Sequence, residues 1–245
     1  MPELKKRKHR SRLRWAVFLF GLAVFGIGVW QLLTHPKSPL PAEWNPVRPL
    51  QVNDPFTPLT PWKLSRALAT RGACLAALKT GAVFDRLPDL EDREACHIRP
   101  QVVLRNAGAA RVVPLKTRCQ TALRLAMWEH HGIRPAAERH LKTELKEIKH
   151  LSSYNCRQMR TTDGSIPRMS THATADAIDI SGFVLADGNT LSLIKDWDKT
   201  GPRAAFLRDV RDSACEWFRV TLGPEYNALH ADHFHLQHTG FGLCR

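Results

Sequence analysis

Histidine and aspartate side chains gather in two short segments of the C-terminal half. His172 and Asp179 lie seven residues apart in S-T-H-A-T-A-D-A-I-D-I, and His233 and His235 form an H-x-H in N-A-L-H-A-D-H-F-H. Imidazole nitrogens and carboxylates are typical zinc ligands, and three protein ligands leave a fourth position open for water. The two segments therefore predict a catalytic type of zinc site, although the same donors also bind other divalent metals.

The expected strands would place these donors on one face. In an extended strand, His233 and His235 point to the same side and the phenylalanine between them points to the other. Asp179 stands in an A-I-D-I alternation, so its isoleucine neighbours face away from it. A carboxylate buried in such a strand needs a partner, and a metal is one. The spacing from His172 to Asp179 does not fix the geometry, because a turn has to lie between them.

An alternative without a metal remains open at this stage. The chain has twelve histidines, and pairs of them arise by chance. A domain held together by disulfides, with histidines that bind no metal, fits the same residues.

Hydrophobic periodicity predicts an α+β domain over residues 62–245, with a small antiparallel sheet and flanking helices. The expected helices cover residues 63–79, 117–131 and 202–220, with Gly132 ending the second. The expected strands cover residues 102–104, 112–114, 176–185 and the H-F-H-L-Q segment.

The N-terminus has the pattern of a membrane anchor. Residues 1–14 contain seven Lys or Arg and one acid, and residues 15–33 carry no charge. Nineteen helical residues reach about 28 Å, close to the thickness of a bilayer core. The basic flank stays in the cytoplasm, so the remainder is exported. We expect a single-pass inner-membrane protein with a periplasmic domain. A cleaved signal peptide is the alternative, but its apolar region is usually shorter.

The next segment and the net charge indicate how the domain is held relative to the membrane and which partners it could have. Residues 34–61 hold eight of the sixteen prolines and predict an extended, semi-rigid spacer. The net charge is +13, of which residues 1–14 supply six. Export argues against nucleic acid as a partner of the remaining basic charge. Anionic cell-wall polymers and phospholipid surfaces are possible partners, and a solvated basic surface with no partner is equally consistent.

Six cysteines on the exported side predict three disulfides. We expect Cys215–Cys244, which would tie the C-terminus to a helix, together with Cys74–Cys96 and Cys119–Cys156.

Several motifs together resemble the bacterial extensin-like C-terminal domain family over about residues 62–245. They are Cys74, S-Y-N-C-R at 153–157, H-A-x-A-D-A-I-D at 172–179, F-L-R at 206–208, L-G-P-E-Y-N-A-L-H-A-D-H-F-H at 222–235, and Cys244-Arg245. This family is in turn similar to D-Ala-D-Ala carboxypeptidases, penicillin-insensitive murein endopeptidases and the hedgehog signalling domain, which share an H-x6-D segment and a later H-x-H.

The resemblance implies roles for six residues. His172, Asp179 and His235 would bind Zn²⁺, and His233 would lie beside the water on the metal. His230 matches a further active-site histidine of the murein endopeptidases. After one inserted cysteine, Arg157 matches the arginine of the S-G-Y-R segment in the carboxypeptidases. The E-x-x-H of the carboxypeptidases is missing, which favours the endopeptidase-like variant.

Two functions follow from this resemblance. The first is an anchored zinc peptidase that cleaves peptides of peptidoglycan, with His233 as the base and with Arg157, or protonated His230, stabilising the oxyanion. The second is a zinc-containing domain that binds the cell wall or a protein partner without catalysis, because a fold does not determine activity. The presence of a base at His233 favours the enzyme.

Overall fold

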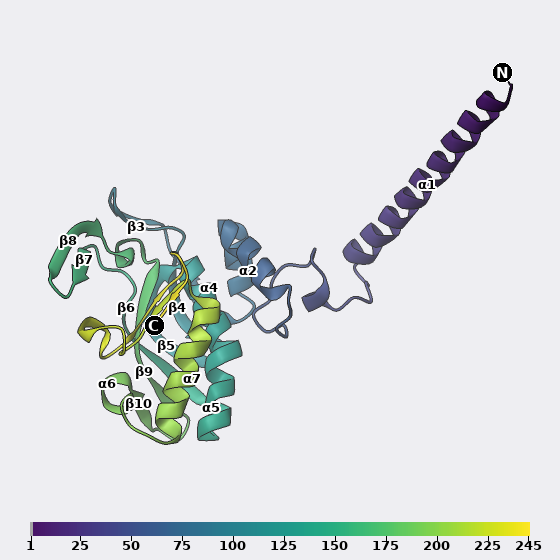
Figure 1. Ribbon diagram of the computed structural model, residues 1–245. Helices are drawn as coiled ribbons and strands as arrows, with labels where there is room; N and C mark the ends of the chain where they lie inside the picture. Colours follow the sequence, from purple (N-terminus) through teal and green to yellow (C-terminus); the bar gives the residue numbers. More distant parts are fainter. Residues whose placement is uncertain (1) are drawn as a thin grey trace.

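The computed structural model describes the backbone of residues 2–245 and the side chains of residues 14–245 apart from Ser165. Met1, the first residue of the predicted basic tail, lies outside the described residues. The chain begins with the long helix α1 (Pro2–Thr34), which extends away from the rest of the molecule (Figure 1). Within the described residues, only the Arg14–Thr34 part of α1 is long and apolar enough to cross a membrane. A membrane span and a signal sequence share this character.

The remaining elements form a mixed α+β structure. Its helices are η1 (Ala42–Trp44), α2 (Thr60–Ala69), α3 (Arg71–Leu78), α4 (Cys119–Trp128), the π-helical η2 (Glu129–Ile133), α5 (Arg134–Leu141), η3 (Thr171–Thr174), α6 (Leu193–Asp196), α7 (Pro202–Trp217) and η4 (Ala228–His230). Its strands are β1 (Ala82–Arg86), β2 (Leu90–Arg93), β3 (Cys96–Ile98), β4 (Gln101–Ala107), β5 (Ala110–Arg118), β6 (Leu145–Ser152), β7 (Gln158–Thr161), β8 (Gly164–Met169), β9 (Ala177–Leu185), β10 (Thr190–Ser192), β11 (Val220–Leu222), β12 (Phe234–Gln237) and β13 (Leu243–Cys244).

The main sheet is larger than expected, and it is mixed. Nine strands take part, in the order β1-β4-β5-β6-β9-β12-β11-β13, and β10 pairs with β9. The prediction of a small antiparallel sheet is therefore wrong, because β5–β6 and β11–β13 are parallel pairs. Parallel neighbours need a crossover connection. The helices α4, η2 and α5 provide it between β5 and β6. Strands β2–β3 and β7–β8 form two separate hairpins.

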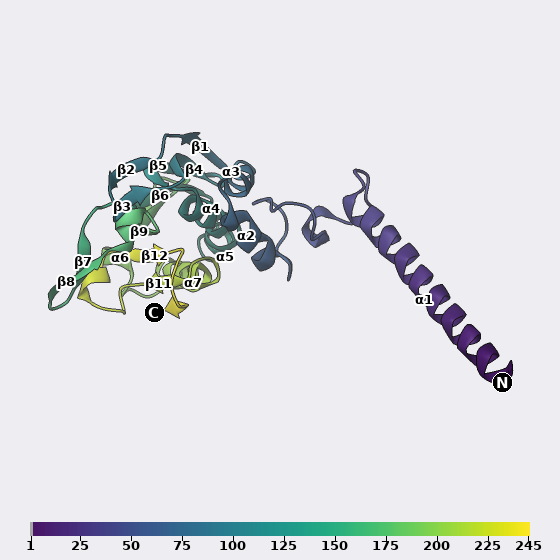
Figure 2. The same ribbon diagram turned by 90° about the horizontal axis from the view of Figure 1, so that it is seen from above.

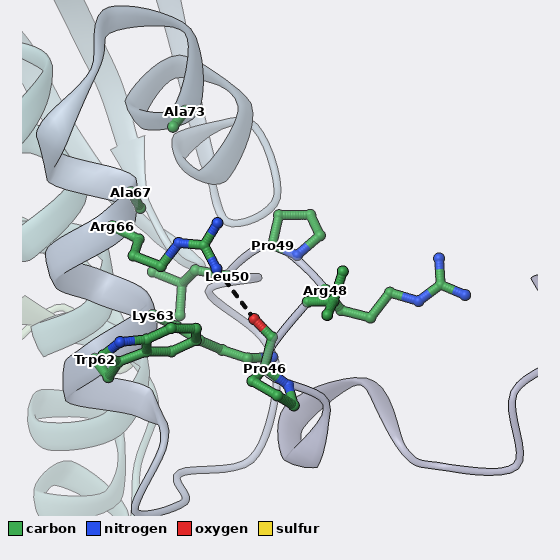
Figure 3. Close-up of a pocket in the computed structure, with 10 residues that line it drawn as sticks. Pro46, Arg48, Pro49, Leu50, Trp62, Lys63, Arg66, Ala67 and Ala73 are labelled. Atoms are coloured by element: carbon green, nitrogen blue, oxygen red, sulfur yellow. Dashed lines mark hydrogen bonds between the residues drawn. The ribbon is translucent and has the colours of Figure 1, made fainter. Parts of the chain in front are cut away.

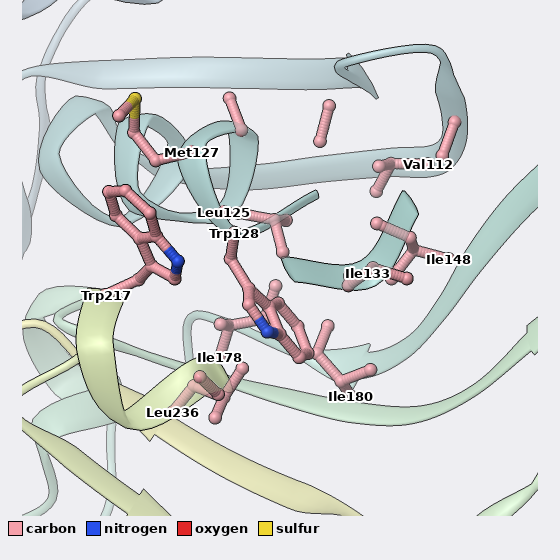
Figure 4. Packing of buried hydrophobic residues seen from close by; sticks show 14 of the residues in the cluster. Val112, Leu125, Met127, Trp128, Ile133, Ile148, Ile178, Ile180, Trp217 and Leu236 are labelled. Carbon is pink, nitrogen blue, oxygen red and sulfur yellow. The ribbon is translucent and has the colours of Figure 1, made fainter. Parts of the chain in front are cut away.

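Helices α4, α5 and α7 lie on one side of the main sheet, and the β7–β8 hairpin lies on the other (Figures 1 and 2). The hydrophobic core fills the layer between these helices and the sheet. Trp128 of α4 is its largest fully buried side chain, and it lies close to Ile178 and Ile180 of β9 (Figure 4). The Trp128 indole also donates hydrogen bonds to Val210 O at 3.1 Å and to Ser213 Oγ at 3.0 Å, which joins α4 to α7.

Two helix predictions need correction. The expected helix over 63–79 is two helices, because the Thr70 side chain accepts a hydrogen bond from the Ala73 N–H and so caps a new helix. Gly132 does not end a helix, since the chain continues through the π-helical turn into α5. The glycine serves packing instead. A Cβ at this position would lie 2.6 Å from Ser213 Oγ on α7.

The six cysteines form three disulfides: Cys74–Cys119, Cys96–Cys156 and Cys215–Cys244. The prediction for the C-terminal pair is confirmed. The Cys74–Cys96 and Cys119–Cys156 pairings are wrong. Cys74 on α3 packs in the core against α4, where Cys119 is the first residue, whereas Cys96 lies in the β2–β3 hairpin. Packing of distant segments brought these pairs together, which sequence spacing does not reveal.

Candidate metal centre

The pairing of β9 with β12 sets the position of two predicted ligands. These strands are antiparallel neighbours, and His235 lies directly opposite Asp179 in their register. The residues on either side of both ligands are fully buried in the core: Ile178, Ile180, Phe234 and Leu236. Because side chains alternate along a strand, Asp179 and His235 emerge together on the sheet face opposite to that core.

The third predicted ligand comes from the short helix η3. The Ser170 side chain caps this helix by accepting a hydrogen bond from the His172 N–H at 3.3 Å. Ala175 then adopts a left-handed conformation with φ of 50°, and this supplies the turn that the spacing from His172 to Asp179 requires. His172 is buried, with 2% of its surface exposed.

The three side chains meet in a compact triangle. His235 Nδ1 lies 2.9 Å from Asp179 Oδ1, and His172 Nε2 lies 3.2 Å from Asp179 Oδ2. The two imidazoles are 3.2 Å apart, between His172 Nε2 and His235 Nδ1. Ligands at about 2.1 Å from a tetrahedral zinc are separated by roughly 3.4 Å. The donor types and their spacing therefore fit a divalent zinc ion held by one carboxylate and two imidazoles.

The orientation of His172 suits a metal ligand. Its Nδ1–H donates to Ser153 O at 3.0 Å, so the lone pair is on Nε2, which faces the triangle. A carbonyl behind a histidine ligand fixes its tautomer in the same way in known metal sites. Ser153 is itself buried and held in place. Its hydroxyl donates to Ala177 O at 2.7 Å and is 2.7 Å from the Thr117 hydroxyl.

The charge of Asp179 is favoured by its surroundings. Burial alone would raise the pKa of this carboxyl group. In the metal-free site, hydrogen bonds and positive charge from the protonated forms of His172 and His235 outweigh burial, so the pKa of Asp179 lies well below its usual range. The group is therefore a carboxylate at neutral pH, as a metal ligand has to be.

His233 lies beside the triangle without being part of it. Its Nε2 is 3.5 Å from Asp179 Oδ1, and its Nδ1–H donates to Asp232 Oδ1 at 2.7 Å. This second bond leaves the lone pair of Nε2 directed toward the site. Asp232 thus fixes the orientation of the His233 ring. The arrangement gives His233 the geometry of a proton acceptor.

His230 completes the wall of the site. Its ring centroid is 5.3 Å from that of His233, and its Nδ1 lies 2.7 Å from Asn227 Oδ1. The same Asn227 oxygen accepts the Leu229 N–H, so it is an acceptor for His230 as well. Burial lowers the pKa of His230 to about 4. The imidazole is then neutral at pH 7 with a lone pair on Nε2, whereas the expected stabilisation of an oxyanion requires the protonated form.

Arg157 is half-buried near the same face. Desolvation lowers its pKa, repulsion from Arg160 adds to this, and attraction to Asp179 opposes it. Its guanidinium donates to Gln158 O at 3.1 Å. Within the described residues it makes no direct ion pair with Asp179. Arg157 directly follows Cys156 of the Cys96–Cys156 disulfide, and its backbone carbonyl accepts the N–H of Ser170, the residue that caps η3.

A second group of residues behind the site was not recognised from the sequence. Asp176 forms an ion pair with Arg118, lies 2.7 Å from His238 Nε2, and accepts the Thr174 hydroxyl at 2.7 Å. Its own carbonyl accepts the His238 N–H at 2.9 Å. Asp176 therefore joins η3 to the end of β12, the two segments that carry His172 and His235. The sequence signal that could have identified Asp176 was its position in the A-T-A-D-A-I-D motif.

Comparison with known proteins identifies the family but no characterised relative. The family model described as "Extensin-like protein C-terminus" matches residues 72–245, which include all six predicted site residues. The match begins ten residues after the expected start of the domain. No curated protein and no solved structure matches the chain. Because the matched region covers most of the chain and every element of the metal centre, this protein belongs to the family of extensin-like protein C-terminal domains.

Proposed function

We propose that this protein is a membrane-anchored, periplasm-facing zinc peptidase that hydrolyses peptide bonds in peptidoglycan. The observation that carries the proposal is the triangle of His172, Asp179 and His235 with His233 Nε2 directed at it from the side. Three donors and an adjacent base are the minimum set for hydrolysis at a metal.

Each residue then has a chemical role. Zinc bound by the triangle supplies a Lewis acid, which acidifies water and polarises a carbonyl group. His233 Nε2 accepts a proton from the attacking water, and Asp232 holds the ring and stabilises the imidazolium that forms. Arg157 is the positive group at the edge of the site, and it stabilises negative charge on the substrate. His230 is neutral and accepts a hydrogen bond.

The compartment supports the choice of substrate. The apolar part of α1 follows seven basic residues, an order that keeps the N-terminus in the cytoplasm and exports the domain. Three disulfides suit an oxidising compartment. A basic domain on that side of an inner membrane meets peptidoglycan, whose peptides carry carboxylates.

A non-catalytic zinc domain that binds the cell wall or a protein partner is the second candidate. It needs the triangle but has no use for a base. The hydrogen bond from His233 to Asp232 favours the enzyme, because it leaves Nε2 as an acceptor facing the site.

The decisive experiment is digestion of purified sacculi by the full chain in detergent, loaded with one zinc per molecule. Released muropeptides are identified by mass spectrometry. We expect peptide-cleaved products from the wild type and a loss of at least about 100-fold for His233→Ala. His140→Ala is the matched control, because His140 pairs with Asp209 on the helix side of the molecule.

Either negative result has a clear meaning. Zinc-loaded protein that binds sacculi and releases nothing would establish the binding domain. Protein that takes up no zinc would overturn both candidates.

A further inference from the structure

The segment that follows α1 is hydrogen-bonded to the end of that helix. Asn45 is fully buried, and its Nδ2 donates to Leu33 O in the last turn of α1 at 2.9 Å. Arg48 Nη2 donates to His35 O at 3.0 Å and to Pro36 O at 3.3 Å. Residues 42–48 therefore lie against the C-terminal end of α1.

The same segment is also attached to the folded domain. Lys63 Nζ on α2 donates to Ala42 O at 2.5 Å, and Arg66 Nη1 donates to Pro46 O at 3.3 Å. Further along, the Val52 N–H donates to Thr80 Oγ1 at 2.8 Å, and Val52 is fully buried. Residues 34–61 were expected to act as an extended spacer, but these contacts pack their central part against the domain. Among the domain helices longer than one turn, α2 lies nearest to α1 (Figures 1 and 2).

An aromatic and basic surface lies at this junction, and its residues are exposed except for the half-buried Arg48. We define the junction patch as Trp44, Val47, Arg48, Trp62 and Arg66. Its three apolar side chains are 43–49% exposed. A cavity of about 150 Å³ opens between the segment and α2, and four of these five residues line it. Figure 3 shows Arg66 above the Trp62 ring, with its guanidinium carbon 4.9 Å from the ring centroid.

We propose that the junction patch contacts the headgroups of anionic phospholipids and so holds the domain directly on the membrane surface. This inference rests on the proposed membrane anchor and does not depend on zinc or catalysis.

The position of the patch favours lipid as its occupant. A 21-residue span has the length of a bilayer core, so the end of α1 lies at headgroup level. Side chains held against that end lie at the same level. Tryptophan prefers this interface, and arginine extends its charge to phosphate while its stem lies on apolar surface. Lys63 does not contribute, because it is buried and already bound to Ala42 O.

The test uses the full chain in liposomes that contain a phosphatidylcholine brominated at acyl carbons 6 and 7, with or without phosphatidylglycerol. Bromine quenches tryptophans near the headgroups. We expect Trp44→Phe and Trp62→Phe each to remove quenched emission, and Trp197→Phe, at a buried site, to remove unquenched emission.

Replacing Arg48 or Arg66 by Gln should lower the ratio of docked to undocked domain about 5-fold each in liposomes that contain phosphatidylglycerol. Arg160→Gln and Arg168→Gln, on the β7–β8 hairpin, should not.

Extraction at alkaline pH separates this inference from the anchor itself. A chain that stays in the bilayer with Trp44 and Trp62 unquenched would overturn the junction patch and leave the anchor intact. A chain that is released from the bilayer would overturn both. Neither result bears on the zinc centre, which is assayed with sacculi.

Discussion

The two faces of strands β9 and β12 serve opposite purposes. On one face, Ile178, Ile180 and Phe234 are fully buried under the helices. On the other face, Asp179 and His235 lie opposite each other and meet His172 of η3. The same four-residue register therefore builds both the core and the candidate metal centre. Alternation along a strand separates them by a single residue, so we expect substitutions on one face to change stability and those on the other to change metal binding.

The two faces also differ in how they are held. The helix side is stabilised by apolar packing around Trp128, with ring centroids of Phe183 and Phe218 at 6.3 Å and 6.0 Å. The site side is stabilised by hydrogen bonds, in which Ser153, Asp176 and Asn227 fix the segments that carry the histidines. Apolar packing tolerates little change in volume, and a polar network tolerates little change in partner.

The largest expected effect comes from truncating the core face. Phe234→Ala removes a fully buried ring that packs 5.7 Å from Trp197, and it should lower the free energy of unfolding by about 3–5 kcal/mol. Without metal, the neighbouring His235→Ala should lower the free energy of unfolding by only about 1–2 kcal/mol, because water can reach the face of the sheet that carries the site. Urea denaturation of both variants in chelator checks this. Equal losses would show that the two faces are not energetically distinct.

Two of the disulfides lie on opposite sides of the sheet and should differ in their effect on zinc binding. Cys74–Cys119 lies under the helices and Cys96–Cys156 beside the metal centre, with sequence separations of 45 and 60 residues. Replacing either pair by serine should cost about 2–4 kcal/mol through loop entropy. Zinc affinity, measured by competition with a chromophoric chelator, should fall only when Cys96–Cys156 is removed. A similar loss of affinity in the Cys74–Cys119 variant would contradict the separation of the faces.

Zinc should stabilise the protein only through the ligands on the site face of the sheet. At a free zinc concentration of 100 times the dissociation constant, binding adds about 2.7 kcal/mol to the free energy of unfolding. A chelator should remove this increment from the wild type. In His172→Ala and Asp179→Asn the increment should be missing from the start, while Phe234→Ala should keep it. Titration calorimetry and thermal melts with and without zinc test the claim, and zinc stabilisation that survives in Asp179→Asn would argue against the assigned ligands.

The smallest expected effect is a pH dependence of the stability that His131, on the helix side of the sheet, contributes. Burial, and then the neighbouring His130, lower the pKa of His131 to about 4 in the folded protein. The unfolded chain, with a pKa near 6.5, binds the proton more tightly. The contribution of His131 to stability is therefore complete above about pH 6.5, falls as the pH drops toward 4, and is constant below that. We expect the free energy of unfolding to fall by about 1–2 kcal/mol over this range, after allowance for solvent screening.

His131→Gln provides the control for that prediction. Glutamine can still donate to Val52 O, which His131 Nε2 contacts at 3.1 Å, but it does not titrate. The difference in unfolding free energy between wild type and variant should shrink between pH 6.5 and 4. A constant difference would show that His131 does not carry the effect.

Much of the candidate metal centre was predictable from local sequence. The A-I-D-I alternation and the H-F-H segment indicated which side chains share a face, because the side-chain period of a strand is two. The C-terminal disulfide and the long helix over residues 202–220 followed from similarly local signals, and the helix is found at Pro202–Trp217.

Residue types and short-range periodicity were enough to predict the set of donor residues, the apolar N-terminal helix and the mixture of helices and strands. The parallel β5–β6 pair, two of the three disulfides, the lowered pKa of His230 and the contact of Asn45 with α1 arise only in the folded chain. All of these depend on segments that are distant in the chain and on burial, which arises when those segments pack together. The distance of 2.9 Å between Asp179 and His235 belongs to the same class, since two strands 56 residues apart must pair before it exists.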